Sequence, residues 1–219
     1  KELCKIPGIV WIRVLYCYPE EIYPELIETI RDEKKICHYL DLPIQHASDR
    51  ILKRMGRRTS KQQLVDIVST LRKEIPDIVL RTTLITGFPG ETQEDHEELM
   101  EFVDQMEFDR LGVFTYSPEE GTKAAEMENQ IPEDVIKDRF DRLLKLVQDI
   151  SAKKAGALTG SVQDVLVEEL DEQQEGLVTG RLSNNSVVHL PGDVSMIGTI
   201  VPVHLKECKG FYYMGEVAE

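Results

Sequence analysis

Hydrophobic and polar residues follow two different periodicities along residues 1–156, and together they predict four strand–helix repeats. Apolar runs rich in β-branched and aromatic residues, typical of strands, cover residues 9–16, 39–45, 78–86 and 111–116. Apolar residues at helical spacing occupy the intervals between these runs. Strands that alternate with helices of this length predict right-handed βαβ crossovers and a parallel sheet.

Residues suited to helix starts fix where these helices begin. Ser48 and Ser60 can cap two helices, and Gln63 completes a capping box with Ser60. The pattern places a first helix over residues 24–37, Thr92 as the cap of another, and Pro132 as the first residue of a long one.

The pattern changes after residue 156, where short alternating runs are separated by Gly, Asn and Asp. Five such runs cover residues 161–169, 176–182, 186–190, 199–205 and 211–216. They predict a small all-β barrel or sandwich of about five strands. We therefore expect two domains, residues 1–156 and 157–219.

The charge and composition of the chain limit the classes of partner that it can bind. The chain has 26 Lys and Arg against 40 Asp and Glu, a net charge of −14, which is unfavourable for general binding to nucleic acid. No apolar stretch approaches the roughly 18 residues that a membrane span needs, so we expect no membrane partner. The cysteines are Cys4, Cys17, Cys37 and Cys208. Their spacing matches no metal motif and no disulfide framework, which favours reduced thiols in a cytoplasmic protein.

Candidate ligand groups follow the predicted strands. The segments 16–19, 45–48, 86–92 and 116–122 are polar or rich in Gly, as a shared pocket at the carboxyl edge of a sheet requires. Strand ends also need such residues simply to turn. On the third strand, Arg81, Thr83 and Ile85 point to one side. Arg81 could pair with a ligand carboxylate or form a structural salt bridge with a neighbouring strand, and both interpretations stay open.

Two further features allow a functional and a structural interpretation. His46 follows Gln45 at a strand end and could act as a general base, although a lone histidine is more often a hydrogen-bonded structural residue. A dense basic run over residues 50–61 could hold phosphate or an acidic partner, or could be a solvated helix face. The chain contains no P-loop, GxGxxG, GxSxG or HExxH motif.

Taken together, several segments resemble the radical-SAM methylthiotransferases in order and spacing. They read LDLPIQHAS at 40–48, RILKRMGRR at 50–58, RTTLITGFPGET at 81–92, FDRLGVFTY at 108–116 and SPEEGTKA at 117–124. The resemblance covers essentially the whole chain. It implies an α/β fold: about four βα units of a partial parallel TIM-like radical-SAM barrel, followed by a small β-barrel called TRAM.

Within that family the barrel segments are similar to the branch that modifies a ribosomal protein. The markers are Gln45-His46, Arg81-Thr82-Thr83 and two acids before Gly121-Thr122. The segment at 180–185, with Gly192-Asp193, looks more like the TRAM of the branch that modifies tRNA. Residues 157–219 carry 3 Lys and Arg against 10 Asp and Glu, which argues against tRNA.

The resemblance implies that a [4Fe–4S] cluster and an electron donor cleave S-adenosylmethionine to a 5′-deoxyadenosyl radical, and that a methylthio group is attached to an unactivated carbon. The implied substrate is the β-carbon of an aspartate in a small-subunit ribosomal protein, or, in the tRNA branch, C2 of an isopentenylated adenosine. The residues that would line the S-adenosylmethionine pocket are Gln45, Arg81, Thr83, Gly87, Phe88, Gly90 and Glu91. No catalytic residue and no metal ligand is assigned.

The family's CxxxCxxC motif does not occur in these 219 residues. We therefore expect that they bind no cluster and are inactive alone, as a fragment that opens with Lys1 would be. A non-catalytic module that binds a ribosomal protein or RNA, and an unrelated βα enzyme, are the alternatives.

Overall fold

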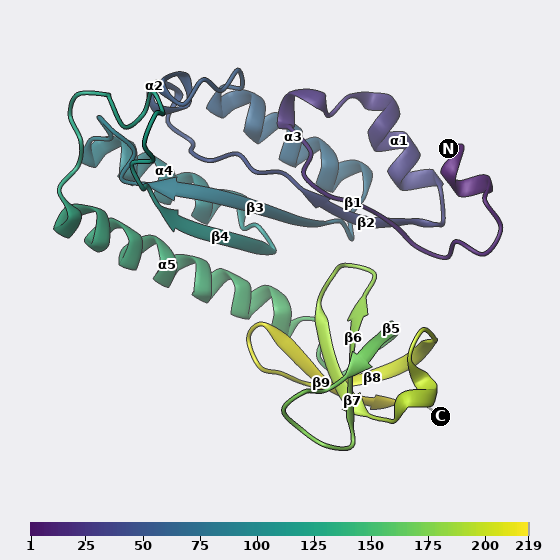
Figure 1. The fold of residues 1–219 in the computed structure, drawn as a ribbon. Helices are drawn as coiled ribbons and strands as arrows, with labels where there is room; N and C mark the ends of the chain where they lie inside the picture. The colour runs from purple at the N-terminus through teal and green to yellow at the C-terminus, as the bar shows by residue number, and fades with distance from the viewer. Residues whose placement is uncertain (219) are drawn as a thin grey trace.

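The computed structural model describes residues 1–218, which form a four-stranded α/β unit and a separate small barrel joined by one long helix (Figure 1). The first unit contains β1 (Ile12–Val14), β2 (Ile36–Asp41), β3 (Val79–Thr86) and β4 (Arg110–Thr115). All neighbouring strands are parallel, in the order β1-β2-β3-β4, as the alternating pattern predicts.

The crossover helices are α1 (Pro24–Asp32), α2 (Asp49–Arg54), α3 (Lys61–Glu74) and α4 (Gln93–Met106). Alternate residues of β3 are buried, so one face of the sheet packs against the helices and the other is more open. Leu80 and Leu84 lie fully buried on the helix side with Phe102 of α4. Arg81 and Thr83 lie on the opposite, inner face.

Helix α5 (Glu133–Gly156) runs along β4 and leads to the second unit (Figure 1). That unit is a closed barrel with the strand order β5-β6-β7-β9-β8. The bounds of its strands are Val162–Leu170, Leu177–Leu182, Val187–Pro191, Ile200–Cys208 and Tyr212–Val217, for β5 to β9. The expectation of a five-stranded all-β unit is therefore confirmed.

Hydrogen bonds from a few side chains connect the two units. Arg13 donates to the carbonyls of Leu182 and Ser183 at 2.9 and 3.0 Å, and Arg110 donates to the carbonyl of Asn185 at 2.9 Å. The hydroxyl of Tyr213 donates to a carbonyl near the end of α5 at 2.8 Å. The β6–β7 turn therefore lies against the inner face of the sheet.

Several predicted boundaries were wrong. The helix predicted to reach Cys37 ends at Asp32, and Cys37 lies inside β2, because pairing with two neighbouring strands outweighs weak helical propensity there. The strand predicted to reach Gln45 ends at Asp41, shortly before Pro43, which has no N–H to donate to the ladder. The first strand covers only three of its eight predicted residues.

The predicted helix caps agree with the structure better than the predicted boundaries do. Ser60 and Thr92 both form complete capping boxes, with Gln63 and with Asp95. Pro132 is the N-cap of α5 and not its first helical residue. Ser48 occupies the N-cap position of α2, but its hydroxyl caps nothing and is used elsewhere.

Candidate functional site

The strand-end segments that were predicted to share a pocket meet at the carboxyl edge of the sheet. Gln45 forms an isolated parallel bridge with Leu84, and the amide of Tyr116 donates to the carbonyl of Thr86 at 2.9 Å. The amide of Cys17 donates to the carbonyl of Asp41 at 2.8 Å. Adjacent strands therefore bring all four segments to one edge, where ligands of parallel sheets bind.

The turn after β3 depends on two glycines. Gly87 and Gly90 have φ values of +80° and +83°, a region that side chains with a Cβ rarely adopt. A Cβ on Gly87 would lie 2.6 Å from the side chain of Ile136, and one on Gly90 would lie 3.1 Å from the guanidinium of Arg54. These two positions let the backbone of residues 87–90 pass close to its neighbours.

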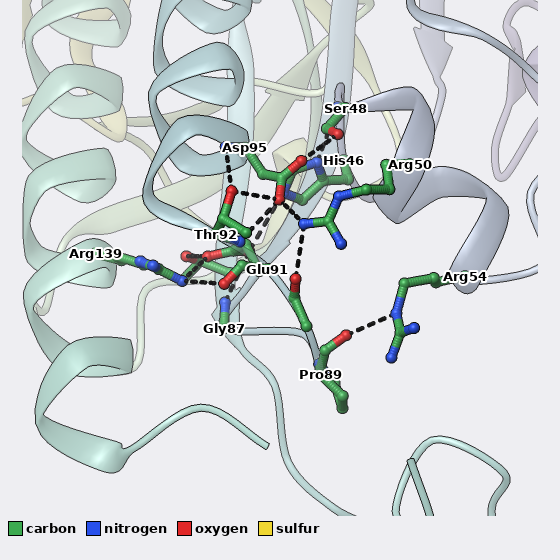
Figure 2. A network of polar contacts seen from close by, with 12 residues as sticks. His46, Ser48, Arg50, Arg54, Gly87, Pro89, Glu91, Thr92, Asp95 and Arg139 are labelled. Carbon is green, nitrogen blue, oxygen red and sulfur yellow. Dashed lines mark hydrogen bonds and ion pairs between the residues drawn. The ribbon is translucent and has the colours of Figure 1, made fainter. Parts of the chain in front are cut away.

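Glu91 holds this turn through its side chain, which lies between Gly87 and Arg139 (Figure 2). Its buried carboxylate accepts hydrogen bonds from the amide of Gly87 at 3.0 Å and from Nη1 of Arg139 at 2.8 Å, and it lies 3.3 Å from Nε2 of His46. Burial alone would raise the pKa of Glu91, but the hydrogen bond from His46 and the charges of His46 and Arg139 outweigh it, and the pKa is lowered. Glu91 therefore faces into the protein, so we expect it to shape the predicted pocket without contacting the ligand.

His46 is fully buried and belongs to the same hydrogen-bond network as Glu91. Its Nδ1 accepts from the amide of Ser48 at 3.0 Å, which leaves the proton on Nε2, the atom that faces Glu91. A histidine with both ring nitrogens engaged by the protein and no solvent exposure fits the structural interpretation and not that of a general base.

Asp95 ties the start of α4 to α2. Its carboxylate accepts from the hydroxyl of Ser48 at 2.6 Å and from the amide of Thr92 at 2.8 Å, and it forms an ion pair with Arg50. Burial by itself would raise the pKa of this carboxyl, but the hydrogen bonds from Ser48, Thr92 and Arg50 lower it to about 2.

The basic run binds the main chain of this edge. Arg50 donates to the carbonyl of Gly90 at 2.7 Å, and Arg54 donates to the carbonyl of Pro89 at 3.0 Å (Figure 2). Arg57 donates to the carbonyl of Pro43 at 2.7 Å. Neither a free phosphate site nor a purely solvated face describes these three side chains, because they fix the two loops next to the candidate pocket.

The sequence interpretation missed Arg139. It lies on α5, only 5% exposed, with its guanidinium on the carboxylate and the carbonyl of Glu91. A signal existed, because Arg139 stands between Ile136 and Leu143 on the apolar stripe of that helix. A charged residue on a buried stripe needs a buried partner of opposite charge.

Three buried acceptors at this edge lack partners among residues 1–218. They are Oδ1 of Asp41, Oε1 of Gln45 and the hydroxyl oxygen of Tyr116. Gln45 itself has a positive φ of 71°, a conformation that costs free energy in a residue other than glycine. The ring of Phe88 packs edge-on against Tyr116 at a centroid distance of 5.4 Å. Unpaired buried acceptors of this kind suit a ligand that carries several hydrogen-bond donors.

Arg81 lies lower on the inner face, where Nη1 contacts Oδ2 of Asp41 at 2.6 Å. The salt bridge with a neighbouring strand, one of its two open interpretations, is therefore present. Its side chain stays 32% exposed, so donors remain available for a ligand. Thr83 lies two residues further along the same face, and its carbonyl accepts from the amide of Gln45 at 2.9 Å.

The described residues hold no group of three or more His, Cys, Asp or Glu that could bind a metal ion. The four cysteines are free, and burial raises the pKa of Cys17 and of Cys37, the opposite of what a metal-binding thiolate needs. The side chains of this chain therefore do not fit an iron–sulfur cluster. No helix in the described part is long and apolar enough to cross a membrane.

Comparison with known proteins relates this geometry to chemistry. Residues 1–103 match the Radical SAM superfamily and residues 156–218 match the TRAM domain. The chain is 51% identical to the ribosomal protein uS12 methylthiotransferase RimO of Lachnoclostridium phytofermentans, over 98% of this chain and 50% of that protein. It is 46% identical to the protein of the same name from Geobacter sulfurreducens, over 99% and 50%.

A relative with a different substrate also matches. The tRNA-2-methylthio-N(6)-dimethylallyladenosine synthase of L. phytofermentans is 43% identical over 98% of this chain and 47% of its own length. The chain thus spans about half the length of the curated relatives it matches.

Among solved structures, the coproporphyrinogen III oxidase of Escherichia coli, a radical-SAM enzyme, matches with a TM-score of 0.52. The match covers 95% of this chain and 52% of the oxidase at 17% identity, and so supports the fold alone. With a partial parallel radical-SAM barrel followed by a TRAM barrel, and near relatives over its whole length, the chain belongs to the radical-SAM methylthiotransferase family.

Proposed function

We propose that the protein to which this chain belongs attaches a methylthio group to the β-carbon of an aspartate in a small-subunit ribosomal protein. The observation that carries this proposal is the identity of 42–51% to four uS12 methylthiotransferases over 98–100% of the chain. The Arg81-Thr82-Thr83 and Gln45-His46 markers favour the same branch.

S-adenosylmethionine, when bound and reduced, supplies the hydrogen-abstracting step of this reaction. Its ammonium, ribose hydroxyls and adenine amino group are hydrogen-bond donors, which suit the unpaired acceptors on Asp41, Gln45 and Tyr116. The cofactor-binding residues that we propose are Gln45, Arg81, Thr83, Gly87, Phe88, Gly90 and Glu91, with Glu91 acting through the turn.

The chain's own contribution in this proposal is to orient the ligand and exclude water. Arg50 and Arg54 hold the carbonyls of residues 89–90 toward α2, while the amides of Gly87 and Gly90 donate to the carboxylate of Glu91 and to the carbonyl of Asn129, so the turn is fixed from both sides. Positioning by a rigid backbone lowers the entropic cost of binding. The cluster must be held by residues outside the set described here, and we assign no step to it.

The division of the chain at residues 156 and 157, the need for an electron donor and a cytoplasmic location complete the proposal. Helix α5 ends at Gly156 and β5 begins at Val162, so a division there would cut neither.

Mass spectrometry of the ribosomal protein, after incubation with the intact, cluster-loaded enzyme, tests the substrate. We expect a methylthio group on one aspartate, and none when that aspartate is replaced by asparagine. A methylthio group on tRNA, with the ribosomal protein unmodified, would favour the tRNA branch, for which the 43% identical synthase is the specific observation.

A further inference from the structure

A cavity of about 880 Å³ lies between the inner face of the sheet, the end of α5 and the TRAM barrel. The first residues of β3 and β4 form one wall, and the β6–β7 turn at residues 183–186 contributes to another. Cavities of this size between two domains commonly bind ligands. Apart from Arg81, which is also among the proposed cofactor-binding residues, the strand residues that line this cavity lie toward the amino ends of β3 and β4, away from the turn after β3.

The charge of this cavity is opposite in sign to that of the chain. Five permanent cations line it against two carboxylates, although the whole chain has 26 basic and 40 acidic residues. The cations are Arg72, Arg81, Arg110, Lys153 and Lys154, and the acids are Asp77 and Asp109. An excess of buried or half-buried positive charge favours an anionic ligand.

Three of the five cations are already engaged elsewhere. Arg72 donates to two main-chain carbonyls at the end of α4, Lys153 pairs with Glu107 at 2.6 Å, and Lys154 lies 3.7 Å from Asp109. These three therefore serve the packing of helices.

The remaining two cations face one another across adjacent strands. Arg81 and Arg110 are directly paired in the β3–β4 register, which places two like charges on the same inner face. Arg81 contacts a single carboxylate oxygen of Asp41. Within residues 1–218, Arg110 has no carboxylate partner and donates a hydrogen bond to the carbonyl of Asn185. Arg110 is half-buried, and burial lowers the pKa of its guanidinium.

We propose that Arg110 and Arg81, with the polar side chains of the β6–β7 turn, bind an acidic side chain of the polypeptide substrate. Ser183, Asn184 and Ser186 line the same cavity and offer hydroxyl and amide donors to a carboxylate. This inference rests on the proposed function, since it takes the substrate to be a protein.

The acidic side chain that binds in this cavity is a different residue from the aspartate that receives the methylthio group in the proposed reaction. Arg81 precedes Thr86, at the carboxyl end of β3, by five residues, a distance of about 16 Å at roughly 3.3 Å per residue. The site therefore adds a second point of recognition and fixes the register of the substrate segment.

A peptide carboxylate fits this cavity better than RNA does. A polynucleotide carries phosphates at every residue, and the TRAM unit around the cavity has 10 acidic residues against 3 basic ones. A cationic recess in a chain of net negative charge complements a single acidic residue within a basic protein segment.

Binding of the purified small-subunit ribosomal protein to the intact protein tests the proposal, with calorimetry as the readout. Arg110→Gln loses the charge and, because its side chain is shorter, the hydrogen bond from Nη1 to the carbonyl of Asn185 as well, and we expect at least about tenfold weaker binding, the value of one charge-assisted hydrogen bond. Arg110→Lys should recover most of the affinity. Arg58→Gln is the matched control, because Arg58 is exposed and lies on the loop after α2.

A second variant and a substrate scan keep the result interpretable. Arg81 forms its hydrogen bond and ion pair with Asp41 of β2 and not with the TRAM unit, so Arg81→Gln removes a charge from the cavity without removing a hydrogen bond to the β6–β7 turn. Replacing one acidic residue of the substrate by its amide should weaken binding to the unchanged protein, and should have no further effect in Arg110→Gln.

The outcomes separate this inference from the proposed function. Binding that is unchanged in both arginine variants, or equally weakened by Arg58→Gln, overturns the inference and leaves the proposed substrate in place. Binding of tRNA in place of the ribosomal protein, weakened by the same arginine variants and by salt, overturns both.

Discussion

The buried Glu91–Arg139 pair is the most sensitive point of the candidate site, and Glu91→Gln probes it directly. One carboxylate oxygen accepts from Arg139 at 2.8 Å and from the hydroxyl of Thr86 at 3.4 Å, and the other accepts from the amide of Gly87 at 3.0 Å. Glutamine replaces one of these oxygens by an NH₂ group. Whichever way the amide turns, one donor then faces another donor, and the buried guanidinium loses its counter-charge.

Removing one partner of a buried ion pair costs about 3–5 kcal/mol, and we expect about 3 kcal/mol because one oxygen remains. At roughly 2–4 °C per kcal/mol for a chain of this size, the α/β unit should unfold about 6–12 °C lower. Trp11 is the only tryptophan and precedes β1, so its fluorescence reports on the α/β unit, which contains both Glu91 and Arg139.

Glu97→Gln is the control, since Glu97 is an exposed residue of α4, the helix that follows Glu91, and its carboxylate accepts a hydrogen bond from Gln93. The double variant Glu91→Gln with Arg139→Met should lose clearly less than the sum of the two single losses. The lowered pKa of Glu91 stabilises the fold above pH 4.5, and this contribution disappears as the pH falls through the lowered value. A Glu91→Gln variant as stable as the Glu97→Gln control at pH 7 would refute this account of the turn.

Three other predictions concern the same two units. Gly87→Ala should cost more than about 1–2 kcal/mol in denaturant unfolding, because its Cβ meets Ile136, whereas Gly121→Ala, with an equally positive φ in open space, should show the conformational cost alone. Burial lowers the pKa of His96 to about 4, so the unfolded state binds its proton first and stability should fall by up to about 3 kcal/mol from pH 6.5 to 4. This slope should be absent in His96→Phe. Tyr213→Phe removes a hydrogen bond of 2.8 Å to the end of α5 and should destabilise the TRAM barrel by about 1 kcal/mol, measured by calorimetry.

The sequence predicts the parallel sheet and the small barrel because periodicity and turn residues act locally. Ser60 and Thr92 cap helices as expected, since a capping box needs only two residues three positions apart. The helix predicted to reach Cys37 was wrong there because the pairing of strands depends on residues far apart in the sequence. Its helical spacing is real, but a central strand gains two ladders of hydrogen bonds that no local pattern contains.

The candidate site is predictable only in part for the same reason. Gly87 and Gly90 are visible in the sequence because glycine marks positive φ. The partners that hold the turn come from elsewhere, Arg50 and Arg54 from α2 and Arg139 from α5, which lies 48 residues beyond Glu91. Only the fold brings these charges together.

Arginine side chains neutralise the buried carboxylates of this acidic chain. Glu91 and Asp95 are buried carboxylates, and each is matched by an arginine that also donates to a main-chain carbonyl. Each arginine therefore stabilises a charge and fixes a segment of backbone at the same time. Arg110 differs from Arg50 and Arg139, because it fixes a carbonyl of the TRAM turn but has no carboxylate partner in the part of the chain described. Several other arginines also donate to main-chain carbonyls without an ion pair there, namely Arg13, Arg54, Arg57 and Arg72. Because the half-buried guanidinium of Arg110 lines the cavity next to Arg81 without a counter-charge among residues 1–218, a negative group from a binding partner is stabilised at this place.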